Sequence, residues 1–313
     1  MKLLIKNLFL VTILYVIIFY PMQVIYTKHY TQHPLENKSN WIFGLKNKTL
    51  DYAVIGSSDA DRGIDINTID SIYGVNGINL AQDGVCLEEN FTMFKKFVNN
   101  NNKIKVLLIS LFGNDFDSKW EFEIHYEKYI PYLNDTLIDA MLKLKTPPLK
   151  YWMLKLIPFS GYAEYNTFFT LKSVIRPKTS AKYFNDCNLA KGTELLYEKQ
   201  NLYKWEDTKY DIKRDGALDK FISYAKSKKI KIVFLVTPKY SVAMRHILNW
   251  KDVNDSIAKL ALNNHIRYFN YTSDTFSICK DSVQFRDASH LNAAGAIAFS
   301  KILAADIIDI VKK

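Results

Sequence analysis

Short apolar runs that are rich in β-branched residues alternate with amphipathic stretches of helical length in two parts of this chain. The apolar runs predict strands at residues 52–55, 76–80, 104–110, 230–236 and 266–271. The amphipathic stretches predict helices at about 65–73, 87–99, 211–227, 252–264 and 293–311. Strands separated by such helices are typical of a parallel sheet with right-handed crossovers. We therefore expect a three-layer α/β/α sandwich around a sheet of roughly five parallel strands.

The composition supports a folded domain of this size. Of the 313 residues, 48% are hydrophobic and 14% are aromatic, which is enough to fill a core. The run from Val106 to Leu111 is apolar throughout except for one serine, as in a strand that is covered by helices on both faces. The domain is expected to cover residues 49–313.

Residues about 116–210 interrupt the alternation and form a predicted insertion between the third and fourth strands. The segment is rich in aromatic side chains: Trp120, Tyr126, Tyr129, Tyr132, Tyr151, Trp152, Phe159, Tyr162, Tyr165, Phe168 and Phe169. One interpretation is a lid or platform on which aromatic rings pack against sugar rings. The other is a small, largely helical subdomain whose aromatic side chains form its own core.

The amino-terminal segment differs from the rest of the chain. The 19 residues from Leu8 to Tyr26 carry no charge, and this is about the length needed to cross a hydrocarbon core of roughly 30 Å. We therefore predict a transmembrane anchor within residues 1–27, followed by a polar linker at residues 28–48.

The residues around the apolar run predict its orientation. Lys2 and Lys6 precede it, so the positive-inside tendency places the amino terminus in the cytoplasm and the rest of the chain outside the cytoplasmic membrane. A cleaved signal peptide is the alternative interpretation. Bulky residues stand where a signal peptidase needs small ones: Tyr20, Pro21, Met22 and Tyr26. A retained single-pass anchor is therefore expected.

The formal charge of +10 does not indicate nucleic-acid binding, because the basic residues are scattered along the chain instead of clustered on one element. A domain beside an anionic membrane, or one that binds anionic glycans, can use such a charge. The three cysteines show no metal-ligand spacing. The sequence contains neither a Walker loop nor a Gly-x-Gly-x-x-Gly fingerprint, so no cofactor and no metal are expected.

Two short segments at opposite ends of the domain carry the side chains that nucleophilic acyl chemistry needs. Ser58 follows a predicted strand and a Gly-Ser turn, which exposes it at the carboxyl edge of the sheet, where sites in open α/β sheets gather. Asp287 and His290 form an Asp-x-x-His block near the carboxyl terminus. A serine needs an imidazole to take its proton, and a carboxylate holds that imidazole in the right tautomer. The predicted catalytic residues are therefore Ser58, His290 and Asp287.

These blocks resemble those of the SGNH, or GDSL-like, hydrolase superfamily, in which a Gly-Asp-Ser-like block carries the nucleophile and an Asp-x-x-His block carries its base. Ser58 matches the nucleophile, and Asp287 and His290 match the last block without departure. Ser57 stands where the family pattern has Asp. The resemblance covers roughly residues 50–115 and 211–312.

The resemblance also implies which groups bind the oxyanion. They are the backbone of Ser58, Gly84 from a second block and Asn114 from a third block. The family pattern of the third block is Gly-x-Asn-Asp, whereas Phe112 occupies its first position here.

Each motif has a structural alternative. A Gly-Ser-Ser segment after an apolar run is a common turn. An Asp-x-x-His segment before a helix can be an N-terminal cap with a satisfied histidine. The joint order of the two motifs, and the strand or helix beside each, favours the catalytic interpretation.

The resemblance implies a serine esterase or O-acyltransferase that acts on acyl esters, such as acetyl esters, through an acyl-serine intermediate. A single anchor followed by such a domain is similar to the accessory proteins of cell-surface polysaccharide O-acetylation and of teichoic-acid D-alanylation. Those proteins work beside a multi-spanning membrane acyltransferase, which is therefore the expected partner, and cell-surface polysaccharides or other acylated glycans are the expected substrates. The alternatives are a catalytically inactive SGNH-fold protein that binds glycans or acts as a scaffold, and a plain lipase-like esterase.

Overall fold

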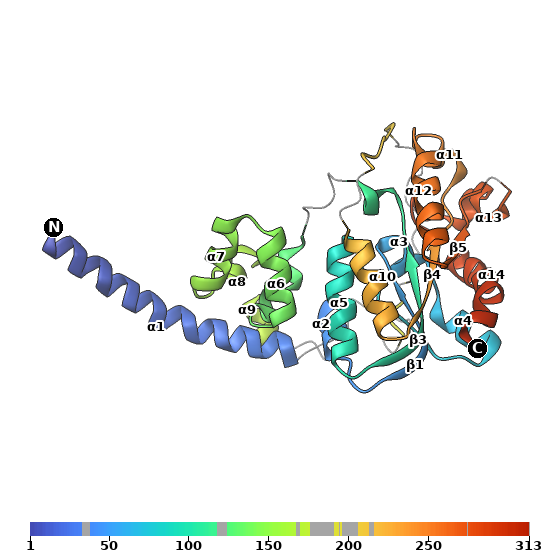
Figure 1. Ribbon diagram of the computed structural model, residues 1–313. Helices are drawn as coiled ribbons and strands as arrows, with labels where there is room; N and C mark the ends of the chain where they lie inside the picture. The colour runs from blue at the N-terminus through green and yellow to red at the C-terminus, as the bar shows by residue number, and fades with distance from the viewer. Residues whose placement is uncertain are drawn as a thin grey trace. The chain divides into compact units, whose positions relative to one another are not determined.

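The computed structural model describes most of the chain: residues 1–32, 38–117, 124–166, 170–175, 191–193, 195, 206–212, 216–273 and 275–312. The chain divides into two compact units. One unit comprises Met1–Gly44 and Ile124–Tyr183, and the other comprises Leu45–Glu123 and Phe184–Lys313. The described part of the first unit is helical, and the second is an α/β unit (Figure 1).

The α/β unit is built on a parallel sheet. Its strands are β1 (Thr49–Ile55), β2 (Gly77–Asn79), β3 (Lys103–Ser110), β4 (Lys231–Val236) and β5 (Arg267–Asn270). They lie in the order β2-β1-β3-β4-β5, and every neighbouring pair is parallel. The predicted sheet of five parallel strands is confirmed. Because all strands run the same way, their carboxyl ends meet at one edge, called the carboxyl edge below.

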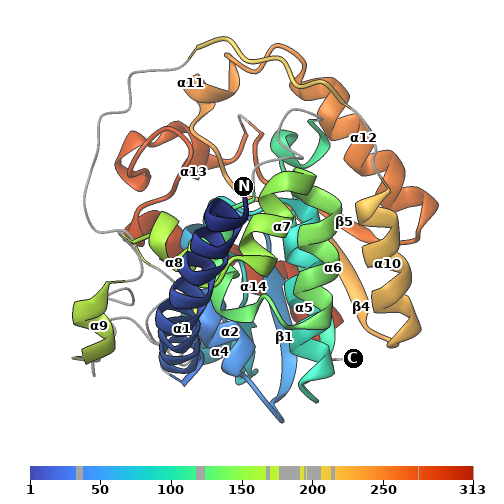
Figure 2. The same cartoon turned by 90° about the vertical axis from the view of Figure 1, so that its left-hand side faces the viewer.

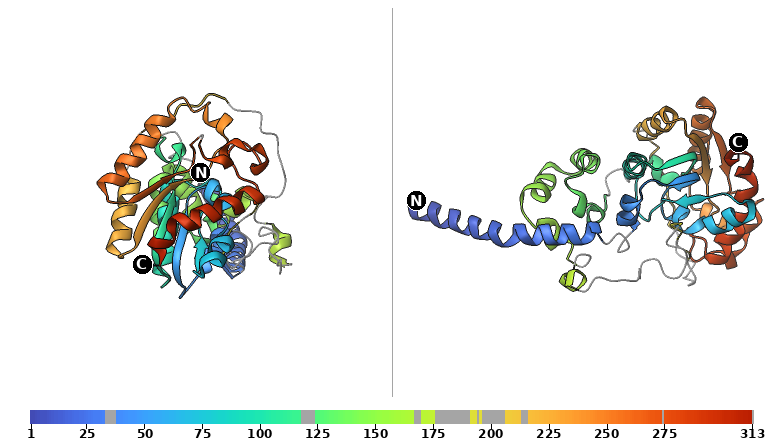
Figure 3. Two further views of the ribbon diagram at one scale, coloured as in Figure 1. Left: turned by 90° about the vertical axis from the view of Figure 1, so that its right-hand side faces the viewer. Right: turned by 90° about the horizontal axis from the view of Figure 1, so that it is seen from below.

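Helices cover both faces of this sheet, as predicted (Figures 2 and 3). Two helices, α4 (Ile66–Tyr73) and α14 (Ala293–Val311), pack together on one face. Two others, α5 (Leu87–Asn99) and α10 (Ala217–Ser227), pack together on the opposite face. A fifth helix, α12 (Trp250–Asn263), connects β4 to β5. The three-layer α/β/α sandwich is therefore present.

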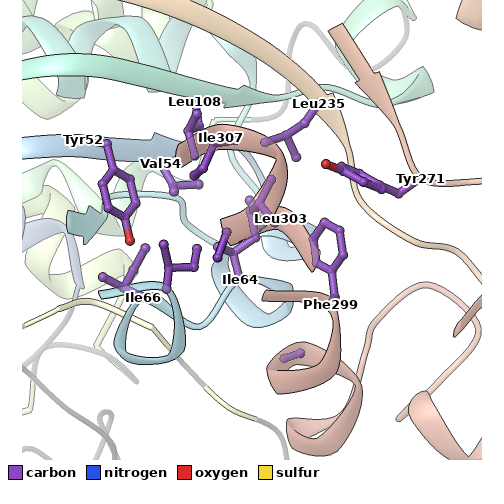
Figure 4. Close-up of a cluster of buried hydrophobic side chains, with 14 of the residues drawn as sticks. Tyr52, Val54, Ile64, Ile66, Leu108, Leu235, Tyr271, Phe299, Leu303 and Ile307 are labelled. Atoms are coloured by element: carbon purple, nitrogen blue, oxygen red, sulfur yellow. The ribbon is translucent and has the colours of Figure 1, made fainter. Parts of the chain in front are cut away.

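The core between the sheet and α14 is apolar and fully buried. Val54 and Leu108 project from the strands toward Phe299 and Leu303 of α14, with Ile64 beside them (Figure 4). Burial of a side chain of this size stabilises the fold by about 1.5–3 kcal/mol. Since α14 begins just after the Asp-x-x-His block, this packing also fixes the position of that block relative to the strands.

The helical unit contains the predicted anchor. Among the residues described, α1 (Lys2–Gln32) is the one helix long and apolar enough to cross a membrane, with a mean hydropathy of 2.3 over an 18-residue window. The other helices of this unit are α2 (Lys38–Gly44), α6 (Thr136–Lys145), α7 (Pro148–Leu156), α8 (Ser160–Glu164) and α9 (Leu171–Ile175).

Aromatic side chains form the core of the helical unit. Tyr26 and Tyr30 of α1 lie 5.3 and 6.3 Å from the ring of Tyr162 in α8, measured between ring centroids. The hydroxyls of Thr27 and Tyr162 share a hydrogen bond of 2.8 Å. This packing fits the interpretation of the insertion as a helical subdomain with its own aromatic core. The described residues do not include Trp120, Phe168 and Phe169.

The predicted linker at residues 28–48 contains helical structure. The anchor helix α1 continues to Gln32, and α2 follows it. The side-chain amide of Asn40 in α2 donates to the backbone carbonyl of Tyr30 at 3.0 Å, which ties α2 to the end of α1. The sequence of this segment has no clear hydrophobic period and therefore did not indicate these helices. Their stability comes from packing within the unit.

One helix begins later than its pattern indicated. The prediction placed a helix at 211–227, whereas α10 begins at Ala217. Gly216, just before it, has a φ of +79°, a left-handed conformation that a helix interior does not allow. Ile212 instead forms an isolated antiparallel bridge with Asp117.

Replacing Phe299 by Ala should lower the free energy of unfolding by about 3–5 kcal/mol, because the change removes a fully buried ring and leaves a cavity against the sheet. Ile302 on the same helix is 36% exposed, so Ile302→Ala is the matched control and should cost much less. Denaturant titration of the full chain in detergent, followed by circular dichroism, measures both. Equal losses in the two variants would contradict the packing described for α14.

Candidate active site

Gly56 turns the chain from β1 into the site. Its φ is +152°, and a Cβ at this position would lie 2.9 Å from the Cβ of Ser110 on the neighbouring strand β3. No side chain fits in that space, so glycine is required here. The next turn opens a short helix, α3 (Ser58–Gly63), where the sequence predicted only a turn. Ser58 is its first residue and stands half-buried at the carboxyl edge.

Backbone contacts hold His290 in the loop before α14. Phe285 and Leu291 form an antiparallel bridge, and the Arg286 N–H donates to the His290 carbonyl at 2.9 Å. The helix cap is Asn292, whose side-chain oxygen accepts a hydrogen bond of 3.0 Å from the first turn of α14. Capping is therefore done by Asn292, so the Asp-x-x-His block is not needed for that role.

Ser58, His290 and Asp287 form a continuous series of hydrogen bonds. The Oγ of Ser58 lies 2.8 Å from Nε2 of His290, although 232 positions separate the two residues. The two carboxylate oxygens of Asp287 lie 2.9 and 3.0 Å from Nδ1 of the same ring. With the imidazole proton on Nδ1, Nε2 can accept the proton of the serine hydroxyl. The structure thus brings all three predicted catalytic side chains together.

Hydrogen bonds keep Asp287 ionised. Burial alone would raise the pKa of Asp287, but hydrogen bonds from the His290 ring and from the backbone N–H groups of Ser289 and His290 lower it to about 2. Asp287 is therefore a carboxylate at neutral pH. These bonds stabilise the fold fully above the ordinary carboxyl pKa of about 3.9, and the stabilisation is lost as the pH falls through about 2.

The predicted oxyanion donors lie around the same edge of the sheet. As the first residue of α3, Ser58 has a backbone N–H with no acceptor inside the helix. Gly84 follows β2 with a φ of +61°, and Asn114 lies in the 3₁₀ turn Gly113–Phe116 after β3. Both are exposed. Among the described residues, no hydrogen bond joins Gly84 or Asn114 to the three catalytic candidates, so their part in the site stays a prediction.

A buried ion pair lies beside the three catalytic candidates. Nζ of Lys239 pairs with the Asp59 carboxylate and donates to the Ser289 carbonyl at 3.2 Å. Only 3% of the Lys239 side chain and 11% of the Asp59 side chain are exposed. Asp59 directly follows Ser58, so one lysine holds both the serine turn and the histidine loop. The sequence prediction missed this pair, because its members are far apart in the chain and form no motif.

The ion pair also sets the charge around His290. The other carboxylate oxygen of Asp59, Oδ1, lies 3.9 Å from Nε2 of the imidazole. A negative charge at this distance would stabilise an imidazolium if His290 took up a proton. Lys239 compensates the same carboxylate while the imidazole is neutral. Removal of either partner would leave an unpaired charge in a buried position.

Phe112, which departs from the SGNH pattern, contacts the same lysine. Nζ of Lys239 lies 4.4 Å from the centroid of the Phe112 ring, a cation–π distance. The ring also packs against Trp250, with centroids 5.1 Å apart, and against Tyr210, with centroids 6.1 Å apart. Tyr210 fills the space where a Cβ on Gly113 would be. Phe112 therefore helps to enclose the buried ammonium group, which a glycine could not do.

Asp115 is a further ionisable group next to the ion pair. Its Oδ2 accepts a hydrogen bond of 2.8 Å from the Phe112 N–H. Burial raises the pKa of Asp115 to about 7; the hydrogen bond from Phe112 opposes this shift, the Asp59 charge adds to it, and the Lys239 charge opposes it. The 3₁₀ turn that carries Asn114 is thus anchored by a carboxyl group that titrates near neutral pH.

The side chains of Ser58, His290 and Asp287 together can activate the serine hydroxyl for attack on an ester carbonyl. Within the part of the chain that the structure describes, no group of three or more His, Cys, Asp or Glu residues is placed to hold a metal ion.

No family model matches the sequence, and no curated protein matches it. Among solved structures, the chain is similar to the crystal structure of a "putative acylhydrolase" from Bacteroides fragilis, with 12% sequence identity and a TM-score of 0.42. The match covers 84% of this chain and 88% of that chain. A similarity at this level bears on neither the reaction nor the site.

Replacing Lys239 by Met removes the buried ammonium group and keeps most of the aliphatic stem. The free energy of unfolding should fall by about 3–5 kcal/mol, because Asp59 is left charged and buried. The double variant Lys239→Met with Asp59→Asn should recover part of this loss. Denaturant titration of both variants measures the effect, and a single variant as stable as the wild type would contradict the role given to the ion pair.

Proposed function

We propose that this chain is a membrane-anchored serine esterase or O-acyltransferase of the SGNH type, which acts outside the cytoplasmic membrane on acyl esters, such as acetyl esters, of cell-surface glycans. The observation that carries the proposal is the hydrogen-bonded series from Ser58 through His290 to Asp287. A histidine with a purely structural role would not need a serine hydroxyl at hydrogen-bond distance from one of its ring nitrogens. Here one ring nitrogen meets a half-buried hydroxyl and the other meets an ionised carboxylate, which is the arrangement of a general base.

The first half-reaction transfers the acyl group to the enzyme. Ser58 Oγ forms a bond to the acyl carbon while His290 Nε2 takes the hydroxyl proton. The Ser58 amide, the Gly84 amide and the Asn114 side chain are the proposed donors to the resulting oxyanion. When the ester bond breaks, His290 returns the proton to the leaving hydroxyl, and the acyl group remains on Ser58.

The second half-reaction releases the acyl group. His290 takes a proton from the acceptor, whose oxygen forms a bond to the acyl carbon. When the bond between that carbon and Ser58 Oγ breaks, His290 returns the proton to Ser58 Oγ and the acyl group leaves on the acceptor. Water as acceptor makes the protein an esterase, and a sugar hydroxyl makes it an acyltransferase. The resemblance to accessory proteins of polysaccharide O-acetylation and teichoic-acid D-alanylation favours transfer beside a multi-spanning membrane acyltransferase.

The anchor and the charge support the proposed location and substrate. A span that includes Leu8 to Tyr26 is long enough to cross the bilayer, and Lys2 and Lys6 favour a cytoplasmic amino terminus. The α/β unit would then lie outside the cytoplasm, where cell-surface glycans are found. A formal charge of +10 suits anionic polysaccharides and an anionic membrane surface.

Covalent labelling should identify Ser58 as the nucleophile. A fluorophosphonate probe should label the wild-type chain and not Ser58→Ala, because the hydroxyl that His290 activates is then missing. The adjacent variant Ser57→Ala is the matched control and should label normally. Labelling can be read by in-gel fluorescence after equal loading of folded protein. Loss of labelling in Ser57→Ala alone would move the nucleophile by one residue, and an unlabelled wild type would favour the inactive, glycan-binding alternative.

The catalytic partners should differ in severity. His290→Ala should be nearly as inactive as Ser58→Ala, since the two residues act as one unit. Asp287→Asn should retain more activity, because Asp287 orients the ring but transfers no proton. Asn114→Ala should lose about 10²–10³-fold in turnover if its side chain binds the oxyanion. Hydrolysis of nitrophenyl acetate, with thermal melts as folding controls, measures all of them; normal turnover in Asn114→Ala would remove Asn114 from the site.

A reporter fusion tests the proposed orientation. Alkaline phosphatase fused to the carboxyl terminus should be active, because the α/β unit is placed outside the cytoplasm and the enzyme needs that environment for its disulfides. A cytoplasmic reporter at the same position is the control and should be inactive. The reverse pattern would show that the chain has the opposite orientation.

A further inference from the structure

One face of α7 in the helical unit is apolar and exposed. Leu149, Trp152 and Leu156 are spaced so that they share one side of the helix, and they are 85%, 49% and 67% exposed. Leu144 at the adjoining end of α6 is 65% exposed, and Ile157 just after α7 is 44% exposed. These five residues are called the α7 face below. The α6–α8 helices that carry it are green in Figure 1.

The opposite side of α7 is already packed. Tyr151 and Leu154 are buried, and Leu154 belongs to the aromatic core of the helical unit together with Tyr26 and Tyr162. The helix is therefore apolar on both sides, with only one of them covered. A surface helix in water normally presents charged or polar side chains on its outer side. Exposed apolar side chains gathered on one side of a helix indicate a site of interaction.

The segment after the α7 face is fixed to the apolar part of α1. The hydroxyl of Tyr15 donates to the Pro158 carbonyl at 2.9 Å, and the Phe159 N–H donates to the side-chain oxygen of Gln23 at 2.6 Å. The rings of Phe159 and Phe19 stack with centroids 5.9 Å apart. Tyr15, Phe19 and Gln23 all lie within the uncharged run of α1. The carboxyl-terminal end of α7 therefore leads directly into residues that contact the segment that would enter a bilayer.

The helix geometry gives the depth of this contact. With a rise of 1.5 Å per residue, Tyr15 lies roughly 16 Å along α1 from Tyr26, the end of the uncharged run. The Pro158 carbonyl, bonded to Tyr15, is thus at the level of the middle of the run. If α1 enters lipid over this run, Pro158 and the adjoining Ile157 reach below the membrane surface.

Charges around the α7 face suit an anionic membrane surface. Lys143, in the last turn of α6, is exposed. The acidic groups near the face are already paired: Asp139 with Lys155, and Glu164 with Lys150. Trp152 is a residue type enriched at membrane interfaces, where its ring is half in apolar surroundings. Leu and Trp side chains with lysine beside them are typical of helices that lie in the headgroup region.

We propose that the α7 face inserts into the leaflet at the carboxyl-terminal end of α1, where it contacts both the acyl chains and the headgroups of anionic phospholipid. The proposal rests on the anchoring of α1 in the proposed function and is independent of the serine chemistry. A second attachment beside the spanning helix would fix the tilt and rotation of the helical unit on the membrane. The lipid is the occupant that the lysine, the tryptophan and the continuity with α1 favour over a second protein.

Tryptophan fluorescence of the full chain in vesicles tests this contact. The vesicles contain phosphatidylethanolamine and phosphatidylglycerol, with or without bromine atoms on the acyl chains. The emission of Trp152 is obtained as the difference between the wild type and Trp152→Phe. Two added tryptophans serve as references: Leu10→Trp reports the anchor, and Leu262→Trp reports a site in the α/β unit that is 76% exposed. Thermal melts check that each variant is folded.

We expect brominated lipid to reduce the Trp152 and Leu10→Trp emissions at least twofold, and aqueous iodide to quench only the Leu262→Trp emission strongly. Iodide quenching of Trp152 equal to that of Leu262→Trp, with the anchor still quenched by lipid, would overturn the inference and leave the face free for a protein partner. Quenching of Trp152 by neither agent would overturn it in favour of a second copy. A Leu10→Trp emission insensitive to lipid would reject the anchor and this contact together, whatever the fluorophosphonate labelling shows.

Discussion

The hydrogen bond between Ser58 Oγ and His290 Nε2 depends on nearly every part of the α/β unit. It joins residues 232 positions apart, so neither local turn can form it alone. Gly56 lets the serine turn pass close to β3, and the packing of α14 on the sheet brings the histidine loop to the same edge. A parallel sheet makes this meeting possible, because the carboxyl ends of all its strands lie together.

Lys239 adds a second link across the same gap. Its ammonium group binds Asp59 next to the nucleophile and the Ser289 carbonyl next to the base. Burial makes this link costly to break, since each charge depends on the other. The aromatic ring of Phe112 lies over the lysine, so the residue at the position that differs from the SGNH pattern has a packing role beside the ion pair.

Much of the α/β fold and the three catalytic candidates could be predicted from the sequence. The features that the sequence did not predict have physical explanations. Buried strands and amphipathic helices produce hydrophobic patterns that can be recognised in the sequence. The serine block and the Asp-x-x-His block are each a short local pattern as well. Lys239 has no such pattern, because its partners are brought to it by the fold. The helices at residues 38–44 and 58–63 were missed because short helices are stabilised by tertiary packing. The exposed side of α7 could be recognised only once its buried side was known.

The proposed function requires that Ser58 carry the acyl group between donor and acceptor. Mass spectrometry of the intact full chain, quenched in acid within the first turnover of nitrophenyl acetate, tests it most directly. We expect a mass increase of one acetyl group, located by peptide mapping on Ser58. An acetyl group on another residue, or hydrolysis without any adduct in the first turnover, would contradict it.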